Sequence, residues 1–314
     1  MTQRSQKIVP CLWFDKNCEE ALSFYLEVFP NSKITSILRY PSDMQVGPEK
    51  DMAGKILTAV FELDGIVFQA LDGGPIFQKN PSVSFMVNFD PSREEKAAER
   101  LEEMWKKLAE SGKVLMPLDA YPFSKKYGWI EDRFGVSWQL ILTDPNGEPR
   151  PSIIPSLLFV KDVCGKAKEA LNFYVGIFKN SKMGMVAPYP AGMEPDKEGT
   201  TMFGEACLDG EWITAMDSAQ MHNFSFNEAI SLSVECADQA EVDYFWEKLR
   251  EDGGMESECG WLKDKYGFSW QIIPKQLEAM FTDPDEKKSN RALKAMLNMQ
   301  KINIAEVQRA YEGE

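Results

Sequence analysis

The sequence predicts an α+β fold with two copies of one domain, each a doubled βαβββ unit, followed by C-terminal helices. One motif occurs twice, at 128–141 and 260–273, with Gly, Trp, Asp, Gly, Ser, Trp and Gln in register. The similarity continues upstream of both copies, which indicates duplication of a whole domain. A proline-rich segment at 144–151 breaks both helix and strand. These observations predict domains over 1–145 and 151–275 and a helical extension over 276–314.

Each repeat opens with an apolar run followed by a segment with helical spacing and a Phe-Tyr pair. In the first repeat this predicts a strand over 9–14 and a helix over 18–29. Alternating apolar and polar residues then indicate strands, and the whole order is stated a second time. The remaining predicted elements are strands over 34–40, 55–63, 66–71 and 83–89, a helix over 93–111, and strands over 113–117, 128–131 and 136–142.

The repeated motif predicts a β-hairpin in each copy. A short strand leads into an Asp-x-x-Gly turn, and a strand of alternating residues follows. We expect Gly135 and Gly267 to adopt positive φ, because the turn needs a left-handed residue there. Trp138 and Trp270 alternate with polar residues along the second strand, so we expect them to pack in the core.

The tail beyond the second repeat matches neither domain. Its apolar spacing predicts a helix over 284–300, capped by Asp283, and a last helix over 304–311. Asn303 and Glu306 form the pattern that opens such a helix. The apolar stripe needs a partner, and we expect it to cover the second domain, with an oligomer contact as the alternative.

Composition limits the classes of function. The net charge of -14, from 49 acidic and 35 basic residues, opposes binding to nucleic acid. No run of about 18 apolar residues predicts a membrane span, and the start leads into a strand, so we expect no secretory signal. The six cysteines form no Cys-x-x-Cys pair, which argues against a zinc ribbon or a disulfide scaffold. We expect a cytoplasmic protein with reduced thiols.

The doubled βαβββ pattern, the Leu-Ser-Phe-Tyr helix with Val-Phe-Pro-Asn-Ser, and the Gly-Trp-x-x-Asp-x-Phe-Gly-x-Ser-Trp-Gln ending resemble a known family. This is the PhnB-like branch of the vicinal oxygen chelate superfamily, which includes glyoxalases, bleomycin-resistance proteins and extradiol dioxygenases. The resemblance implies that each domain forms one U-shaped mixed sheet around a small-molecule pocket. It also implies an internal pseudo-dimer, because single-domain relatives commonly pair, and this allows the chain to be a monomer.

The resemblance also implies where a metal would bind. Metal-dependent members place ligands on the first and last strand of each unit, facing the pocket. Counting along the strands puts these positions at Pro10, Gln69, Ser82 and Gln139 in the first domain and at Pro155, Thr214, Ala229 and Gln271 in the second. Neither this register nor one shifted by a residue offers a set of His and carboxylate ligands. We therefore expect neither a metal nor another cofactor.

Two classes of function remain open. The first is a metal-independent protein that binds or sequesters a small-molecule ligand. Its candidate ligand-binding residues are Gln69, Ser84, Trp129 and Gln139 in the first domain and Thr214, Ser231, Trp261 and Gln271 in the second. The second class is an enzyme, either a metal-dependent lyase or isomerase of the glyoxalase type or a methyltransferase, since some relatives carry a demethylubiquinone methyltransferase name. No Gly-x-Gly-x-x-Gly segment follows a strand, which disfavours a Rossmann-type methyl-donor site.

Three further side chains carry reactive groups. His222 lies in a loop before a strand and is a candidate general base, although we expect an exposed loop histidine. Cys236 and Cys259 are candidates to face the second pocket. No base or cation is close to either in the sequence, so we expect unreactive thiols.

Overall fold

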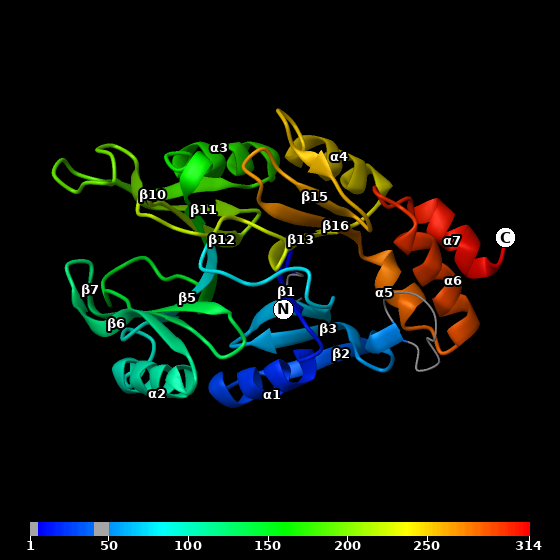
Figure 1. Cartoon of the computed structure of the whole chain (residues 1–314), viewed down its shortest axis with the longest axis horizontal. Helices are drawn as coiled ribbons and strands as arrows, with labels where there is room; N and C mark the ends of the chain where they lie inside the picture. The colour runs from blue at the N-terminus through cyan, green and yellow to red at the C-terminus, as the bar shows by residue number, and fades with distance from the viewer. Residues whose placement is uncertain (1–5, 41–49) are drawn as a thin grey trace.

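The computed structural model describes residues 6–40 and 50–314, which form strands β1 to β16 and helices α1 to α7 (Figure 1). Residues 1–5, on which the expectation of no secretory signal rests, lie outside the described residues. In the part of the chain that is described, no helix is both long and apolar enough to cross a membrane.

Both repeats contain the doubled βαβββ unit that the sequence predicts. The first repeat consists of β1 (Ile8–Phe14), α1 (Cys18–Val28), β2 (Lys33–Arg39), β3 (Ile56–Leu63), β4 (Ile66–Asp72), β5 (Val83–Phe89), α2 (Ala97–Ala109), β6 (Lys113–Tyr121), β7 (Ser124–Glu131) and β8 (Ser137–Leu142). The second consists of β9 (Ile153–Phe159), α3 (Ala167–Ile177), β10 (Lys182–Pro188), β11 (Thr201–Leu208), β12 (Glu211–Asp217), β13 (Ile230–Cys236), α4 (Gln239–Leu249), β14 (Met255–Glu256), β15 (Trp261–Lys263) and β16 (Ser269–Pro274).

The strands form two mixed eight-stranded sheets, and each sheet takes one unit from either repeat. The order is β14-β15-β16-β13-β1-β4-β3-β2 in one sheet and β10-β11-β12-β9-β5-β8-β7-β6 in the other. Antiparallel pairing of β1 with β13, and of β5 with β9, joins the repeats. The α+β fold with tandem glyoxalase-like repeats is confirmed. The expectation that the two units of one domain share a sheet is wrong, because each sheet is completed across the repeats.

We name the two pockets by their sheets. Cup 1 is the face of the first sheet that carries Cys11, Gln69, Ser231 and Gln271. Cup 2 is the face of the second sheet that carries Ser84, Gln139, Ser156 and Thr214. The pairs Cys11 with Gln69 and Ser156 with Thr214 are neighbours across parallel strands in the same register, so the two cups are equivalent by the repeat.

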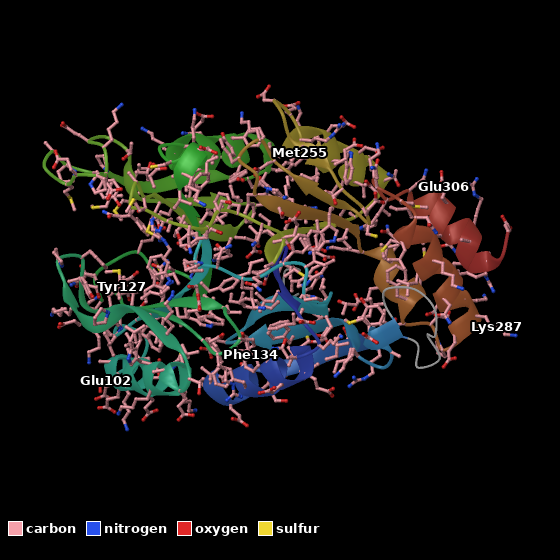
Figure 2. The ribbon with its side chains drawn as sticks, viewed as in Figure 1. Glu102, Tyr127, Phe134, Met255, Lys287 and Glu306 are labelled. Carbon is pink, nitrogen blue, oxygen red and sulfur yellow. The ribbon has the colours of Figure 1, made fainter. Side chains whose placement is uncertain are left out.

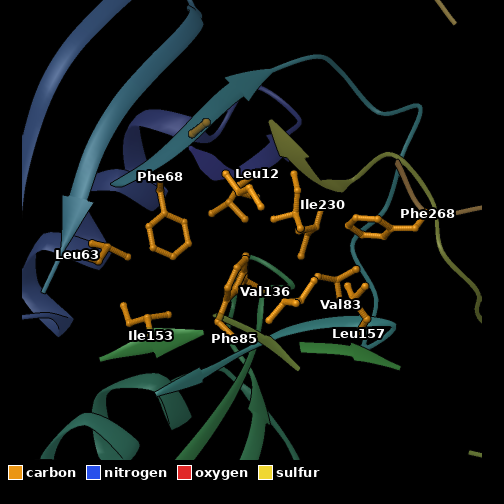
Figure 3. Packing of buried hydrophobic residues seen from close by; sticks show 14 of the residues in the cluster. Leu12, Leu63, Phe68, Val83, Phe85, Val136, Ile153, Leu157, Ile230 and Phe268 are labelled. Atoms are coloured by element: carbon orange, nitrogen blue, oxygen red, sulfur yellow. The ribbon is translucent and has the colours of Figure 1, made fainter. Parts of the chain in front are cut away.

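The backs of the two sheets meet in one hydrophobic core. Phe68 of the first sheet lies 5.1 Å from Phe85 of the second, measured between ring centroids. Leu12, Ile153 and Leu157 lie around this contact (Figure 3). Helices α1 and α2 lie along one side of the molecule, and α3 and α4 along the opposite side (Figure 1). Because the backs of the sheets meet, the cups on their other faces point away from each other.

The repeated motif is a structural hub built around a buried aspartate. Asp132 accepts hydrogen bonds from the Tyr25 hydroxyl at 3.0 Å and the Trp138 indole N–H at 2.8 Å. It also accepts two backbone N–H bonds, from residues 134 and 136. Asp264 accepts the equivalent four bonds in the second repeat, including those of Tyr174 and Trp270. The predicted burial of both tryptophans is confirmed, because Trp138 and Trp270 have no exposed surface.

The turns have the predicted backbone conformation. The φ angle is 80° at Gly135 and 79° at Gly267, which confirms the expected left-handed residue in each hairpin. The N–H of Gly135 donates to the carbonyl of Asp132 at 2.9 Å, and Gly267 makes the same bond to Asp264. The turn and the buried aspartate are therefore one unit, since the same residue closes the turn and anchors the aromatic side chains.

The tail forms α5 (Gln276–Phe281), α6 (Glu286–Leu297) and α7 (Ile304–Glu312) around a small cluster of its own, with Met280, Ala292 and Val307. Helix α5 was not predicted. The prediction that Asp283 caps α6 is wrong, because the Asp285 side chain accepts the N–H groups of residues 287 and 288. The Asn303 cap is confirmed by its bond from the N–H of Glu306.

The tail docks on the second repeat, as expected. The backbone N–H groups of Cys259 and Gly260 donate to the carbonyls of Met299 and Gln300, both at 2.7 Å. Gln239 of α4 adds a bond to the carbonyl of Ile302 at 3.1 Å. These contacts place α5 and α6 beside the open side of the first sheet (Figure 1).

Candidate functional site

A cavity of about 760 Å³ lies in cup 1. Strands β1 to β4 form one wall, β15 and β16 form part of the other, and helices α5 and α6 contribute the roof. Its volume falls within the range of about 300–1,000 Å³ that is typical of small-molecule sites. Most of the lining is apolar, and it includes Leu38, Leu57, Leu71, Leu277, Phe281 and Met296.

Neutral hydrogen-bonding groups form the floor of cup 1. The Gln271 side-chain amide donates to the Ser231 hydroxyl at 2.9 Å. Cys11 lies beside both, and burial raises the pKa of its thiol to about 11, against a smaller opposing effect of its bonds to Gln271 and Ser231. The thiol therefore stays protonated at neutral pH, where it is neither a nucleophile nor an anionic ligand.

Three carboxylates line this cavity, those of Asp51, Glu235 and Glu278, and Glu235 is the one that extends from a strand of the sheet, β13. The Gln69 side-chain amide donates to Glu235 Oε1 at 3.2 Å. Burial raises the pKa of Glu235, and the charge of Lys275 acts against that shift. A half-buried carboxylate is costly to desolvate, so it is a feature that a ligand-binding role would explain.

Two tryptophans stand at the wall of the cavity. The rings of Trp13 and Trp261 lie 6.2 Å apart at an angle of 79°. The Trp13 indole N–H donates to the carbonyl of Gly74 at 2.7 Å, and Phe77 packs edge-on against the same ring at 5.0 Å. Trp13 is thus fixed in orientation, and the pair offers rigid aromatic faces to a bound molecule.

The equivalent groups of cup 2 bond to one another. The hydroxyl of Tyr127 donates to Gln139 Oε1 at 2.7 Å, and Gln139 Nε2 donates to Ser84 at 2.7 Å and to Ser156 at 3.3 Å. Gln139 has no exposed surface. Figure 2 shows Tyr127 at the opposite end of the molecule from Lys287 and Glu306 of the tail. The amide that is available in cup 1 is therefore fully used in cup 2.

A second set of side chains occupies the cup 2 side of the second sheet. Glu205, next to Thr214 across β11 and β12, accepts two bonds from the Arg150 guanidinium, at 2.6 and 3.2 Å. The guanidinium lies 3.8 Å from the centre of the Trp212 ring. Arg150 thus occupies both the charge of Glu205 and the face of the Trp212 ring.

The structure regroups the eight predicted ligand-binding residues. Cup 1 brings Gln69 of the first repeat together with Ser231, Trp261 and Gln271 of the second. Cup 2 brings Thr214 of the second repeat together with Ser84, Trp129 and Gln139 of the first. The predicted grouping by domain is wrong, because β1 pairs with β13 and β5 pairs with β9. Gln69, Trp261 and Gln271 line the 760 Å³ cavity, and no cup 2 residue does.

The counted positions on the first strands also need correction. Pro10 and Pro155 face away from the cups and line a small cavity of about 30 Å³ between the sheets. Ser82 and Ala229 precede strands β5 and β13. The residues that face the cups at these positions are Cys11, Ser84, Ser156 and Ser231. The residues at the last-strand positions, Gln69, Gln139, Thr214 and Gln271, do lie on the faces of the sheets that form the cups.

Sequence reasoning missed Glu235 and the roof. The alternation of Ser231, Ser233 and Glu235 along β13 was the available signal, because residues two apart share one face of a strand. Cys236, one residue further, is instead fully buried in the core, whereas Cys259 does line the cavity. His222 is half-buried, and its Nε2 lies 2.8 Å from the Ser218 hydroxyl.

The donor groups of the cups do not fit a divalent metal. Cup 1 offers a protonated thiol, a hydroxyl and two amides at the four positions, and cup 2 offers hydroxyls and one amide. These neutral groups would leave the charge of a dication uncompensated, unlike imidazole, thiolate and carboxylate ligands. Within residues 6–40 and 50–314, no three His, Cys, Asp or Glu side chains come together in the arrangement of a metal site.

Comparison with known proteins relates both repeats to one family. The model described as 3-demethylubiquinone-9 3-methyltransferase matches residues 6–141 and again 151–273. The PhnB protein from Bacillus cereus is 40% identical over 44% of this chain and 100% of its own, with a TM-score of 0.39. Protein PA1353 from Pseudomonas aeruginosa is 28% identical over 44% of this chain and 98% of its own, with a TM-score of 0.38.

Glyoxalase I from Zea mays is similar over both repeats together. It is 13% identical, covers 86% of this chain and 92% of its own, and has a TM-score of 0.51. At this identity the likeness shows the fold alone. A search of curated proteins finds no match to the chain.

Proposed function

The chain belongs to the 3-demethylubiquinone-9 3-methyltransferase family, of the PhnB-like type with the vicinal oxygen chelate fold, and we propose that it is a metal-independent protein that binds or sequesters a small molecule in cup 1. The observation that carries the proposal is the 760 Å³ cavity with its apolar walls, two tryptophans and few polar groups. Gln69, Trp261 and Gln271 are the proposed ligand contacts, with Ser231 holding Gln271 in place.

Cup 2 is proposed to be structural. Its Gln139 is bonded to Tyr127, Ser84 and Ser156, so a ligand would have to break bonds that the chain already makes. Trp129 donates its indole N–H to the Ser137 hydroxyl at 3.2 Å. We therefore expect one ligand per chain.

A pair of equivalent substitutions tests the proposal. Leu71 lines the cavity in cup 1, and Met216 holds the matching place in cup 2, since each is the neighbour of an equivalent residue on the adjoining strand. The probe is N-phenyl-1-naphthylamine, a neutral apolar dye that fluoresces in apolar sites. We expect one equivalent to bind, Leu71→Trp to weaken binding by about tenfold or more, and Met216→Trp to leave it unchanged.

Two results would contradict this reading. Binding of two equivalents of the dye, or equal losses in the two variants, would mean that cup 1 has no special role. Catalytic conversion of a bound molecule in the presence of added Zn²⁺ or Ni²⁺, lost on Leu71→Trp, would favour the chelate-type lyase or isomerase instead.

We also propose that the chain acts as a monomer and works in the cytoplasm. Both eight-stranded sheets are completed by pairing between the two repeats, so the internal pseudo-dimer needs no second chain. The six cysteines are free thiols, which suits a reducing compartment. Sedimentation that shows an obligate tetramer would contradict the first proposal, and fractionation of cells tests the second.

A further inference from the structure

The charges around the cup 1 cavity leave a net negative group at Glu235. Lys275 and Lys7 are the cations that lower the Glu235 pKa, and the carboxylate of Glu278 acts in the opposite sense. Lys7 directs its ammonium to the Glu241 carboxylate, at 2.6 Å, and to the backbone carbonyl of Glu235 rather than to its carboxylate. The described lining of the cavity carries three carboxylates, those of Asp51, Glu235 and Glu278, and two lysines, Lys16 and Lys275. Lys16 pairs with Asp51 at 3.8 Å, so Lys275 is left beside two carboxylates.

Lys275 and Glu235 differ in their exposure to solvent, so their charges do not cancel. Lys275 is exposed, whereas Glu235 is half-buried. Water and salt screen an exposed charge strongly, so Lys275 offsets the Glu235 carboxylate only in part. Among the described residues, the one side chain hydrogen-bonded to the Glu235 carboxylate is the neutral amide of Gln69, at Oε1.

We propose that cup 1 takes an amphipathic amine, in which an aromatic or aliphatic body fills the apolar cavity and a protonated nitrogen pairs with Glu235. This inference rests on the proposed function of cup 1. An ammonium group would donate hydrogen bonds to the carboxylate and replace the water that burial removes from it. The apolar body would lie against Trp13, Trp261 and the roof of α5 and α6.

The residue of cup 2 at the position of Glu235 is neutral, and this difference between the cups supports the assignment. Asn88 holds the place of Glu235 on the equivalent strand, and its side-chain amide donates to the carbonyl of Pro151 at 2.8 Å. Cup 2 thus has no carboxylate at this position, and it is also the cup in which the floor groups bond to one another. The carboxylate therefore accompanies the cavity, as expected if its role is to recognise a ligand.

A matched set of probes tests the inference by calorimetry. The probes are 2-(2-naphthyl)ethylamine, 2-(2-naphthyl)ethanol and 2-naphthylacetate, which share one apolar body and differ in the charge of the polar group. At neutral pH we expect the amine to bind about tenfold or more tightly than the alcohol, and the carboxylate to bind least tightly. In Glu235→Gln we expect the amine and alcohol affinities to come within about threefold, with alcohol binding unchanged.

Glu198→Gln is the control, because this exposed carboxylate lies outside the lining of the cavity. A thermal midpoint equal to that of the wild type confirms that Glu235→Gln is folded. Equal binding of amine and alcohol, preference for the carboxylate, or an amine preference that survives Glu235→Gln would overturn the inference while leaving the proposed function intact. Binding of none of the three probes would contradict the proposed function as well.

Discussion

The two cups share a framework and differ in what fills it. Each presents a glutamine beside a tryptophan, Gln271 with Trp261 and Gln139 with Trp129, in the same strand register. The residue before the Gly-Trp pair is Cys259 in cup 1 and Tyr127 in cup 2. Tyr127 reaches the glutamine and satisfies it, whereas Cys259 leaves the glutamine to the cavity. A few inward-facing residues therefore determine whether this duplicated framework leaves an open cavity or fills the space with internal hydrogen bonds.

The edges of the sheets differ in the same sense. Cup 2 has a long edge hairpin, β6 and β7, in which Tyr121 and Phe123 stack at 5.7 Å. In cup 1 the matching strand β14 is short, and the tail helices contribute the roof in its place. The hubs around Asp132 and Asp264, by contrast, are the same in both repeats. We therefore expect stability to depend on both repeats alike and ligand binding to depend on cup 1.

The largest expected effect comes from removing a hub. Asp132→Ala and Asp264→Ala each leave four buried donors without an acceptor. We expect each to lower the free energy of unfolding by about 3–5 kcal/mol, and by similar amounts in the two repeats. Chemical denaturation measures both, with the surface change Asp162→Ala as control. A loss below about 1 kcal/mol in either variant would show that the hub is not a main source of stability.

The hub of the second repeat also predicts a pH effect. Burial raises the pKa of Asp264 to about 6, and its four hydrogen bonds oppose the shift. A raised pKa means that the folded protein holds this proton more tightly than the unfolded chain, so its contribution is largest at low pH and is lost as the pH rises through about 6.

Comparison with Asp264→Asn isolates that contribution, because the variant cannot titrate at this position. Between pH 7 and pH 4, we expect the stability of the wild type relative to the variant to rise by about 1–3 kcal/mol. Denaturation at several pH values measures the difference. A difference that stays constant, or one that falls on acidification, would contradict the raised pKa.

The hairpin turns should respond to a side chain at the left-handed position. Gly135→Val forces a β-branched residue to a φ of 80°, so we expect a loss of more than about 1 kcal/mol. Gly267→Val, with a φ of 79°, should cost a similar amount. Lys107→Gln on the exposed face of α2 is the control and should be near neutral. Equal unfolding midpoints for Gly135→Val and the control would disprove the role of the turn.

The smallest expected effect is that of added metal. Because the four counted positions of each cup offer neutral donors, Zn²⁺, Ni²⁺ or Fe²⁺ should leave the thermal midpoint unchanged, and untagged protein should contain less than one equivalent per cup. Elemental analysis measures the content. One equivalent of a transition metal per cup, lost on Gln69→Ala or Gln139→Ala, would restore the metal-dependent enzyme as the leading function.

Features of the fold that depend on local pattern could be predicted from the sequence alone. The strand order within a unit, the left-handed glycines and the burial of Trp138 and Trp270 follow from spacing and turn chemistry. The exchange of units between sheets was not predictable from the repeat, because identical units can pair within or between domains. Pro10 was placed on the wrong face because a shift of one residue along a strand reverses its side. Glu235 was missed because the roof that helps to enclose it comes from a tail that matches neither repeat.

We propose that cup 1, and not cup 2, binds the ligand. Tryptophan fluorescence tests it directly, because Trp261 and Trp129 hold equivalent positions and only Trp261 lines the cavity. We predict that 2-(2-naphthyl)ethylamine changes the fluorescence of the wild type and of Trp129→Phe by similar amounts. In Trp261→Phe the change should be clearly smaller, with Trp13 at the same wall accounting for the remainder. A signal that is lost in Trp129→Phe and kept in Trp261→Phe would place the ligand in cup 2 and contradict the proposed function of cup 1.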